Sequence, residues 1–119
     1  MMIKTITITL FIMLSTIYAK SFIHPLDFKG TDKEKELVIT YIENDVKETY
    51  CEIGMCEASI LRMMEEEELN SFKLLTKVKN RVILDSVIKT YCEIGMCNYT
   101  TILMMYEEEL DASKKSLEW

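Results

Sequence analysis

The stretch Thr-Tyr-Cys-Glu-Ile-Gly-Met-Cys occupies residues 49–56 and recurs without change at residues 90–97. The two copies contain all four cysteines of the chain. The similarity continues at the same offset, with 14 of 23 positions identical between residues 47–69 and residues 88–110. Identity at this level and at one fixed offset indicates a tandem duplication, so the fold is expected to be built from two copies of one unit.

Apolar residues recur at helical intervals on both sides of the glycine in each copy. Before the glycine they are three to five positions apart, as expected for the buried face of an amphipathic helix. These residues are Leu37, Tyr41, Val46, Tyr50 and Ile53 in the first copy and Val78, Val82, Val87, Tyr91 and Ile94 in the second. After the glycine, a second stripe is formed by Ile60, Leu61, Met64 and Leu69, and then by Ile102, Met105 and Leu110.

Gly54 and Gly95 predict the turns between these helices. A glycine just past the last periodic residue is the expected left-handed C-cap, because it lacks the Cβ that makes this conformation unfavourable. We expect the next helix of the first copy to start at about Met55 or Cys56. The predicted fold class is therefore all-α, with about four helices in two tandem hairpins.

The helical domain is predicted to cover residues 31–119. Thr31 and Glu34 form a capping box, which marks the start of the first helix. The two repeats within this domain are assigned to residues 31–70 and 72–115.

The boundary between the second and third helices is less well marked. No glycine or proline occurs between Met55 and Ile94. The repeat offset favours a break near Asn70 and Ser71, which are both suitable capping residues. The acidic run at residues 65–68 argues for a helix that continues, because negative side chains are unfavourable at a helix C-terminus. We expect a kink or a short turn near Asn70, and a continuous helix is the alternative.

Residues 1–19 have the pattern of a secretory signal peptide. Lys4 lies in a short basic region, an apolar stretch follows at residues 6–18, and cleavage is expected after Ala19. The apolar stretch is short for a membrane span, so we expect a secreted, extracellular protein with no stable membrane anchor. Residues 20–30, which contain the only proline and the only histidine, are expected to form a flexible N-terminal tail.

Secretion places the four cysteines in an oxidising compartment, where disulfides are the default. Cysteines five positions apart in one helix have Cα atoms more than about 8 Å apart, beyond the usual disulfide range of about 4.4–6.8 Å. A turn at the intervening glycine brings them within range. We therefore expect Cys51 to pair with Cys56 and Cys92 with Cys97, one disulfide at each elbow. Pairing across the repeats, which joins Cys51 to Cys92 or Cys97, is the alternative.

The charge of the chain argues against nucleic acid as a partner. The chain has 20 acidic and 14 basic side chains, a net charge of −6. Such a surface repels phosphate backbones, and no basic patch is evident.

The sequence contains no arrangement typical of a catalytic or metal centre. The four cysteines have C-x4-C spacing, which differs from that of zinc ribbons, and we expect no metal and no cofactor. His24 is the only histidine and lies in the predicted tail, so no histidine-dependent catalytic triad is expected. Paired methionines at residues 63–64 and 104–105 are interpreted as core residues. We therefore expect a protein that is not an enzyme.

Asn98 begins an Asn-Tyr-Thr sequon and is a possible N-glycosylation site. It directly follows Cys97 at an expected helix start, where access is restricted. Tyr50 and Tyr91, each next to the first cysteine of a pair, are interpreted as aromatic residues that pack against the elbow.

The signal peptide, the small helical body and the two cysteine pairs, each with an adjoining tyrosine, resemble the Bicycle family of aphid secreted proteins. The residues that carry the resemblance are Tyr50, Cys51, Cys56, Tyr91, Cys92 and Cys97. The resemblance implies a salivary effector delivered into a plant host, with a link to gall development in some members.

We expect a secreted, non-enzymatic, effector-type protein that acts by binding a host protein. The alternative is a saposin-like or carrier module that holds a lipid or another apolar ligand between its hairpins. The sequence specifies neither which host protein is bound nor the oligomeric state.

Overall fold

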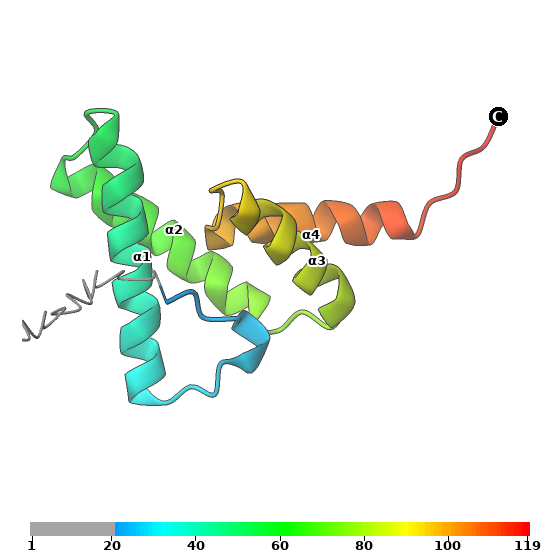
Figure 1. Ribbon diagram of the computed structural model, residues 1–119, viewed down its shortest axis with the longest axis horizontal. Helices are drawn as coiled ribbons and strands as arrows, with labels where there is room; N and C mark the ends of the chain where they lie inside the picture. The colour runs from blue at the N-terminus through cyan, green and yellow to red at the C-terminus, as the bar shows by residue number, and fades with distance from the viewer. Residues whose placement is uncertain (1–20) are drawn as a thin grey trace, which may run out of the picture.

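The computed structural model describes residues 21–119, so the predicted signal peptide lies outside the described residues. All regular structure in this part of the chain is helical, which confirms the all-α fold. A short 3-10 helix, η1 (Pro25–Asp27), precedes four α-helices: α1 (Asp32–Glu52), α2 (Ala58–Leu75), α3 (Arg81–Glu93) and α4 (Tyr99–Ser113). These form two hairpins, α1–α2 and α3–α4 (Figure 1). No described helix has the length and apolarity needed to cross a bilayer.

The capping box predicted at Thr31 is present. The Thr31 hydroxyl oxygen accepts a hydrogen bond from the Glu34 amide at 3.2 Å. The Glu34 carboxylate in turn accepts from the Thr31 hydroxyl at 3.0 Å and from the Lys29 amide at 3.2 Å. The first hydrogen bond satisfies a backbone donor that a helix start leaves unpaired. The hydrogen bonds from Lys29 and Thr31 hold the pKa of Glu34 below its ordinary value.

Both elbows end their first helix in the same way. Gly54 and Gly95 have φ angles of 78° and 79°, in the left-handed region. The amide after each glycine donates to a carbonyl five residues back, Met55 to Tyr50 and Met96 to Tyr91, both at 2.8 Å. This is the Schellman motif, and it confirms the predicted turns. The following helices begin at Ala58 and Tyr99, slightly later than expected, because the residues before them, Glu57 and Asn98, have an extended backbone.

The break between the hairpins lies later than the sequence predicted. α2 continues through Ser71, because Ser71, Phe72 and Leu75 are buried, and it ends only at Leu75. Ser71 therefore does not cap a helix; its hydroxyl hydrogen-bonds that of Thr100 at 3.1 Å. The boundary near Asn70 was thus wrong by about one helical turn. The acidic run lies inside α2, as the opposing argument indicated.

A short loop at residues 76–80 separates the two hairpins. Asn80 caps α3 by accepting a hydrogen bond from the Ile83 amide at 3.0 Å. The Asn80 amide donates to the Tyr106 hydroxyl at 3.2 Å, which ties the loop to α4. The first residues of the second copy belong to α2 and to this loop. α3 therefore has 13 residues, whereas α1 has 21.

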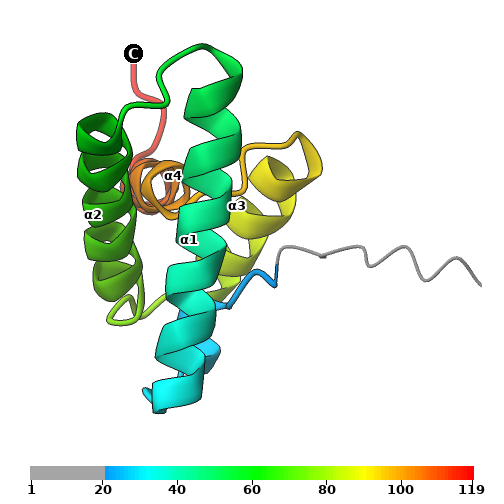
Figure 2. The same ribbon diagram turned by 90° about the vertical axis from the view of Figure 1, so that its left-hand side faces the viewer.

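The hairpins cross each other and do not align as an antiparallel bundle. In Figure 1, α4 begins beside α2 and extends away from the first hairpin, at a steep angle to α1, and Figure 2 shows it end-on between α2 and α3. α2 packs against both α1 and α4, and α3 packs against α4. The first turn of α4 therefore points into the first hairpin.

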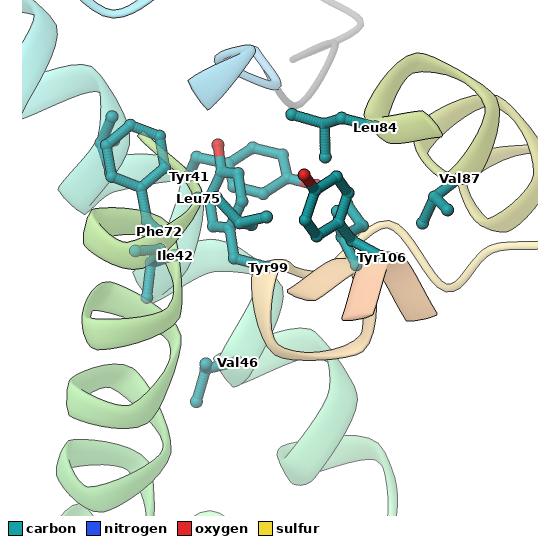
Figure 3. Close-up of a cluster of buried hydrophobic side chains, with 11 residues drawn as sticks. Tyr41, Ile42, Val46, Phe72, Leu75, Leu84, Val87, Tyr99 and Tyr106 are labelled. Carbon is teal, nitrogen blue, oxygen red and sulfur yellow. The ribbon is translucent and has the colours of Figure 1, made fainter. Parts of the chain in front are cut away.

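The core lies where the four helices meet (Figure 3). Tyr99, at the start of α4, is fully buried, and its ring lies 4.8 Å from that of Phe72 and 5.5 Å from that of Tyr41. The other buried apolar residues are Val38, Ile42, Val46, Leu75, Leu84, Val87, Ile102 and Tyr106. Four members of the predicted stripes are instead exposed to solvent: Leu37, Ile53, Val82 and Ile94.

The segment predicted to be a flexible tail is packed onto the helices over residues 22–28. The Phe22 ring stacks on Tyr99 at 5.2 Å and meets Tyr41 edge-on at 5.7 Å. The Ile23 backbone makes two hydrogen bonds with the Tyr99 hydroxyl, at 3.2 and 3.0 Å. The Phe28 ring meets Phe72 edge-on at 5.1 Å. The prediction rested on helix signals that begin only at Thr31, whereas the aromatic residues of the segment determine its position.

Additional polar contacts join this segment to α3. Arg81 donates to Asp27 at 2.8 Å and lies 3.7 Å from Asp85. The Arg81 guanidinium lowers the pKa of Asp27 through this hydrogen bond. Residues 22–28 thus contact elements of both hairpins.

Replacing Gly54 with alanine should lower the free energy of unfolding by about 1–2 kcal/mol, the cost of a left-handed conformation for a residue with a Cβ. No atom beyond the two neighbouring residues lies within 4 Å of the position that this Cβ would take, so the cost comes from the backbone and not from a clash. Gly54→Asn is the matched control and should cost less, because asparagine tolerates this conformation. Urea unfolding of both variants measures the difference. Equal stability of Gly54→Ala and the wild type would show that the turn does not need the glycine.

Candidate functional site

The two elbows, residues 50–57 and residues 91–98, are stapled in the same way. Cys51 is bonded to Cys56 and Cys92 to Cys97, with Cα atoms 4.3 and 4.1 Å apart. The structure therefore has the local pairing and not the cross-repeat alternative. Each short closed loop is worth roughly 2 kcal/mol on the chain-entropy account. All four sulfurs are used, so none is free to bind zinc as a thiolate.

Each elbow exposes apolar side chains at its tip. Ile53 and Ile94 are 65% and 63% exposed, and Met55 and Met96 are 41% and 44% exposed. The two copies thus match in side-chain environment as well as in sequence. Isoleucine is among the residue types most often buried, and both tips expose it to nearly the same extent.

The repeat has diverged in the segment that directly follows the motif and is similar again at residues 63–69 and 104–110. The eight residues of the motif are identical, whereas the next six positions, residues 57–62 against 98–103, all differ. Packing does not restrict an exposed side chain, so the retained isoleucine is not explained by the core.

Most of the other motif residues have structural explanations, although the threonine and the glutamate of the motif are also exposed in both copies. The cysteines form the staples, and the glycines adopt the left-handed turn. Tyr50 and Tyr91, expected to pack against the elbow, are partly buried against the core. A Schellman motif is often accompanied by an apolar contact between the residues at the positions of Met55 and Tyr50, which explains part of the retention of methionine. Ile53 and Ile94 have no such role and are the strongest candidates for binding.

In both repeats, one methionine of the pair packs against the core and the other is exposed. Met64 and Met105 pack against the core, as predicted. Met63 and Met104 are 58% and 54% exposed, so their interpretation as core residues was wrong. They add two apolar side chains to the surface of α2 and α4.

The second elbow is fixed to the first hairpin by two polar contacts. The Tyr41 hydroxyl donates a hydrogen bond to the Cys97 carbonyl. The buried carboxylate of Glu68 accepts from the amides of Tyr99 at 2.7 Å and Thr100 at 3.2 Å. Glu68 therefore caps α4 from α2, where the positive end of the helix favours a negative charge.

Burial governs the ionisation of these groups. Desolvation raises the pKa of Glu68, although its hydrogen bonds to Thr100 and Tyr99 act in the opposite direction. Desolvation also raises the pKa of Tyr41 and of Tyr99. Both phenols therefore remain protonated and able to donate their hydrogen bonds at physiological pH.

The elbows are held at a defined separation. Tyr41, which contacts the second elbow, precedes Ile53 by twelve residues of α1 and its cap, about 18 Å at 1.5 Å per residue. Both elbows lie in the upper half of the molecule as drawn in Figures 1 and 2. Two rigid apolar tips are thus presented at a fixed spacing.

Asn98, the possible glycosylation site, has a structural role in the fold. Its side-chain oxygen accepts a hydrogen bond from the Thr101 amide at 2.8 Å and caps α4. The hydroxyl of Thr100, the third residue of the sequon, forms a hydrogen bond with the hydroxyl of Ser71. Glycosylation at Asn98 stays a prediction.

His24 is not placed as a catalytic base. Its Nδ1 accepts a hydrogen bond from the Leu26 amide at 3.1 Å, and its Nε2 lies 2.6 Å from the Asp85 carboxylate. Both ring nitrogens are therefore engaged in anchoring the N-terminal segment. Across residues 21–119, no cluster of three or more histidine, cysteine, aspartate or glutamate side chains has the geometry to hold a metal ion.

Comparisons with protein-family models, curated proteins and solved structures find no match. Function is therefore inferred from the geometry and from the resemblance noted in the sequence.

Glu68→Gln should change how stability depends on pH. A carboxyl group with a raised pKa disfavours the folded state progressively as pH rises from its ordinary value of 4.5 to its folded value. The free energy of unfolding of the wild type minus that of Glu68→Gln should therefore fall as pH increases over this window. Chemical unfolding at a series of pH values measures this difference.

Glu109→Gln is the matched control. Glu109 occupies the equivalent position of the second copy and is exposed. A wild-type minus Glu68→Gln difference that rises with pH, or that follows the Glu109→Gln control, would contradict the assigned role of burial at Glu68.

Proposed function

We propose that this protein is a secreted, non-enzymatic effector that acts by binding a host protein through the tips of its two elbows. The observation that carries the proposal is the equal exposure of Ile53 and Ile94 in a motif that has stayed identical between the copies. The disulfides and the left-handed glycines hold both tips in one conformation. Little conformational entropy is then lost when they bind, which favours affinity.

The charge around the tips indicates what kind of surface would bind them. Glu52 and Glu57 in the first elbow and Glu93 in the second are exposed beside the isoleucines. A complementary partner would have an apolar pocket for each isoleucine, with lysine or arginine at its rim. A partner that accommodates both tips would gain from bivalent attachment, since the second contact forms within an existing complex.

The resemblance to the Bicycle family supports delivery into a plant host. The disulfides are compatible with an oxidising extracellular compartment. The engagement of both ring nitrogens of His24 supports a role in binding and not in catalysis.

The test is an affinity comparison between elbow variants. A plant protein captured by the wild-type chain should be lost with the double variant Ile53→Ser and Ile94→Ser. Each single variant should weaken binding roughly tenfold or more, because burial of an isoleucine contributes about 1.5–3 kcal/mol. Calorimetry with the purified partner measures the dissociation constants.

Val82→Ser is the matched control, because Val82 is 80% exposed, is also β-branched and lies on α3 outside the elbows. It should leave binding unchanged. A partner bound equally well by the double elbow variant, or lost with Val82→Ser, would rule out the elbow tips as the binding surface.

A further inference from the structure

An apolar groove runs between α1 and α2 at the end of the first hairpin that is remote from its elbow. Its main cavity has a volume of about 490 Å³, within the range of about 300–1,000 Å³ typical of small-molecule sites. The apolar lining consists of Phe28, Val38, Ile39, Leu69 and Phe72. Val38 and Phe72 are buried core residues, so the floor of the groove is part of the rigid core.

The groove continues along the hairpin toward the elbow. A second cavity of about 130 Å³ shares Ile39 and Leu69 with the first, so the two lie next to each other on the same face of the hairpin. α1 and α2 lie side by side in Figure 2, with the elbow above and the open end of the hairpin below. Along α1 the lining extends from Lys35 to Glu43, a rise of about 12 Å. The shape suits an extended chain better than a compact ring system.

The two ends of the groove carry opposite charge. Lys35 and Lys73 line the open end, one from each helix. At the end near the elbow, the lining includes Glu43, Glu65 and Glu66. Arg62 also lies there, but it is paired with Glu65 at 3.0 Å. A ligand with one anionic end is therefore oriented by the groove, with that end between the lysines.

The lysines are available for such a ligand. Within residues 21–119, neither Lys35 nor Lys73 forms an ion pair or a side-chain hydrogen bond. Their positive charge at the mouth of an apolar groove favours an anionic ligand.

We propose that this groove binds a free fatty acid, with the carboxylate between Lys35 and Lys73 and the hydrocarbon chain over Ile39 and Leu69. The net negative charge of the protein opposes adsorption to an anionic membrane, which favours a free fatty acid over a lipid within a bilayer. The site is distinct from the elbow tips and does not depend on the proposed function. It also differs from the carrier alternative, which placed the ligand between the two hairpins, whereas this groove lies between α1 and α2 of one hairpin.

The test is calorimetric titration of the full secreted chain with dodecanoate below its micellar concentration. One equivalent should bind saturably. Dodecyltrimethylammonium, which has the same chain and the opposite charge, should bind at least tenfold more weakly. The double variant Lys35→Gln and Lys73→Gln should lose at least about tenfold in affinity for dodecanoate, as expected for the loss of charge-assisted hydrogen bonds.

The double variant Lys47→Gln and Lys89→Gln is the matched control. It removes the same charge from exposed lysines outside the lining and should bind dodecanoate as the wild type does. Ile39→Ser tests the apolar wall and should weaken dodecanoate binding, and its circular dichroism and melting curve verify that it folds.

Several outcomes would overturn the proposal. These are the absence of saturable dodecanoate binding, equal losses in the two lysine double variants, and equal affinity for the cationic amphiphile. Co-sedimentation with phosphatidylserine vesicles without binding of free dodecanoate would assign the groove to membrane lipid instead. Because Ile53→Ser should retain dodecanoate binding, failure of the groove is distinguishable from failure of the elbow proposal.

Discussion

The arrangement of the two hairpins depends on the burial of Tyr99 at the first turn of α4. Its hydroxyl both donates to and accepts from the Ile23 backbone, and its amide donates to Glu68. Its ring lies among those of Phe22, Tyr41 and Phe72, and such aromatic pairs contribute about 0.5–1.5 kcal/mol each beyond area burial. One residue thus connects both hairpins and the N-terminal segment, and the direction in which α4 enters the first hairpin follows from its position.

The duplication produced two similar hairpins, but differences between the copies determine how they pack. The position of Tyr99 is occupied by Ala58 in the first copy, and that of Tyr106 by Glu65. The second copy could therefore supply aromatic residues that the first lacks. Glu68 and Glu109 are identical in the repeat, yet Glu68 is buried beneath α4 and Glu109 is exposed. Local structure follows the repeat, whereas tertiary contacts break its symmetry.

This distinction explains how much the sequence could predict. The elbows, their staples and the capping box depend on residues within one turn of each other, and all three were predicted correctly. The end of α2 depends on burial of Phe72 and Leu75 against the rest of the fold, so the local capping signal at Asn70 was misleading. Residues 22–28 were predicted to be a flexible tail, because the partners that fix their position lie far along the chain and leave no local signal in the sequence. No local signal separates Glu68 from Glu109, and none showed that Ile53 and Ile94 are exposed.

The two proposed binding surfaces depend on different kinds of contact: the elbow tips depend on local contacts, and the groove depends on tertiary contacts. Each elbow tip is held by a disulfide and a Schellman turn within its own loop, so it keeps its shape while exposing apolar side chains. Without such local constraint, an exposed isoleucine would lose conformational freedom on binding and contribute less to affinity. The groove depends on tertiary packing, because its floor, Val38 and Phe72, is part of the shared core. It therefore requires the assembled fold, in which Phe28 from the N-terminal segment forms part of the lining. The shape of each elbow tip requires only its own hairpin, whereas the spacing of the two tips requires the contacts of Tyr41 and Glu68 with the second elbow.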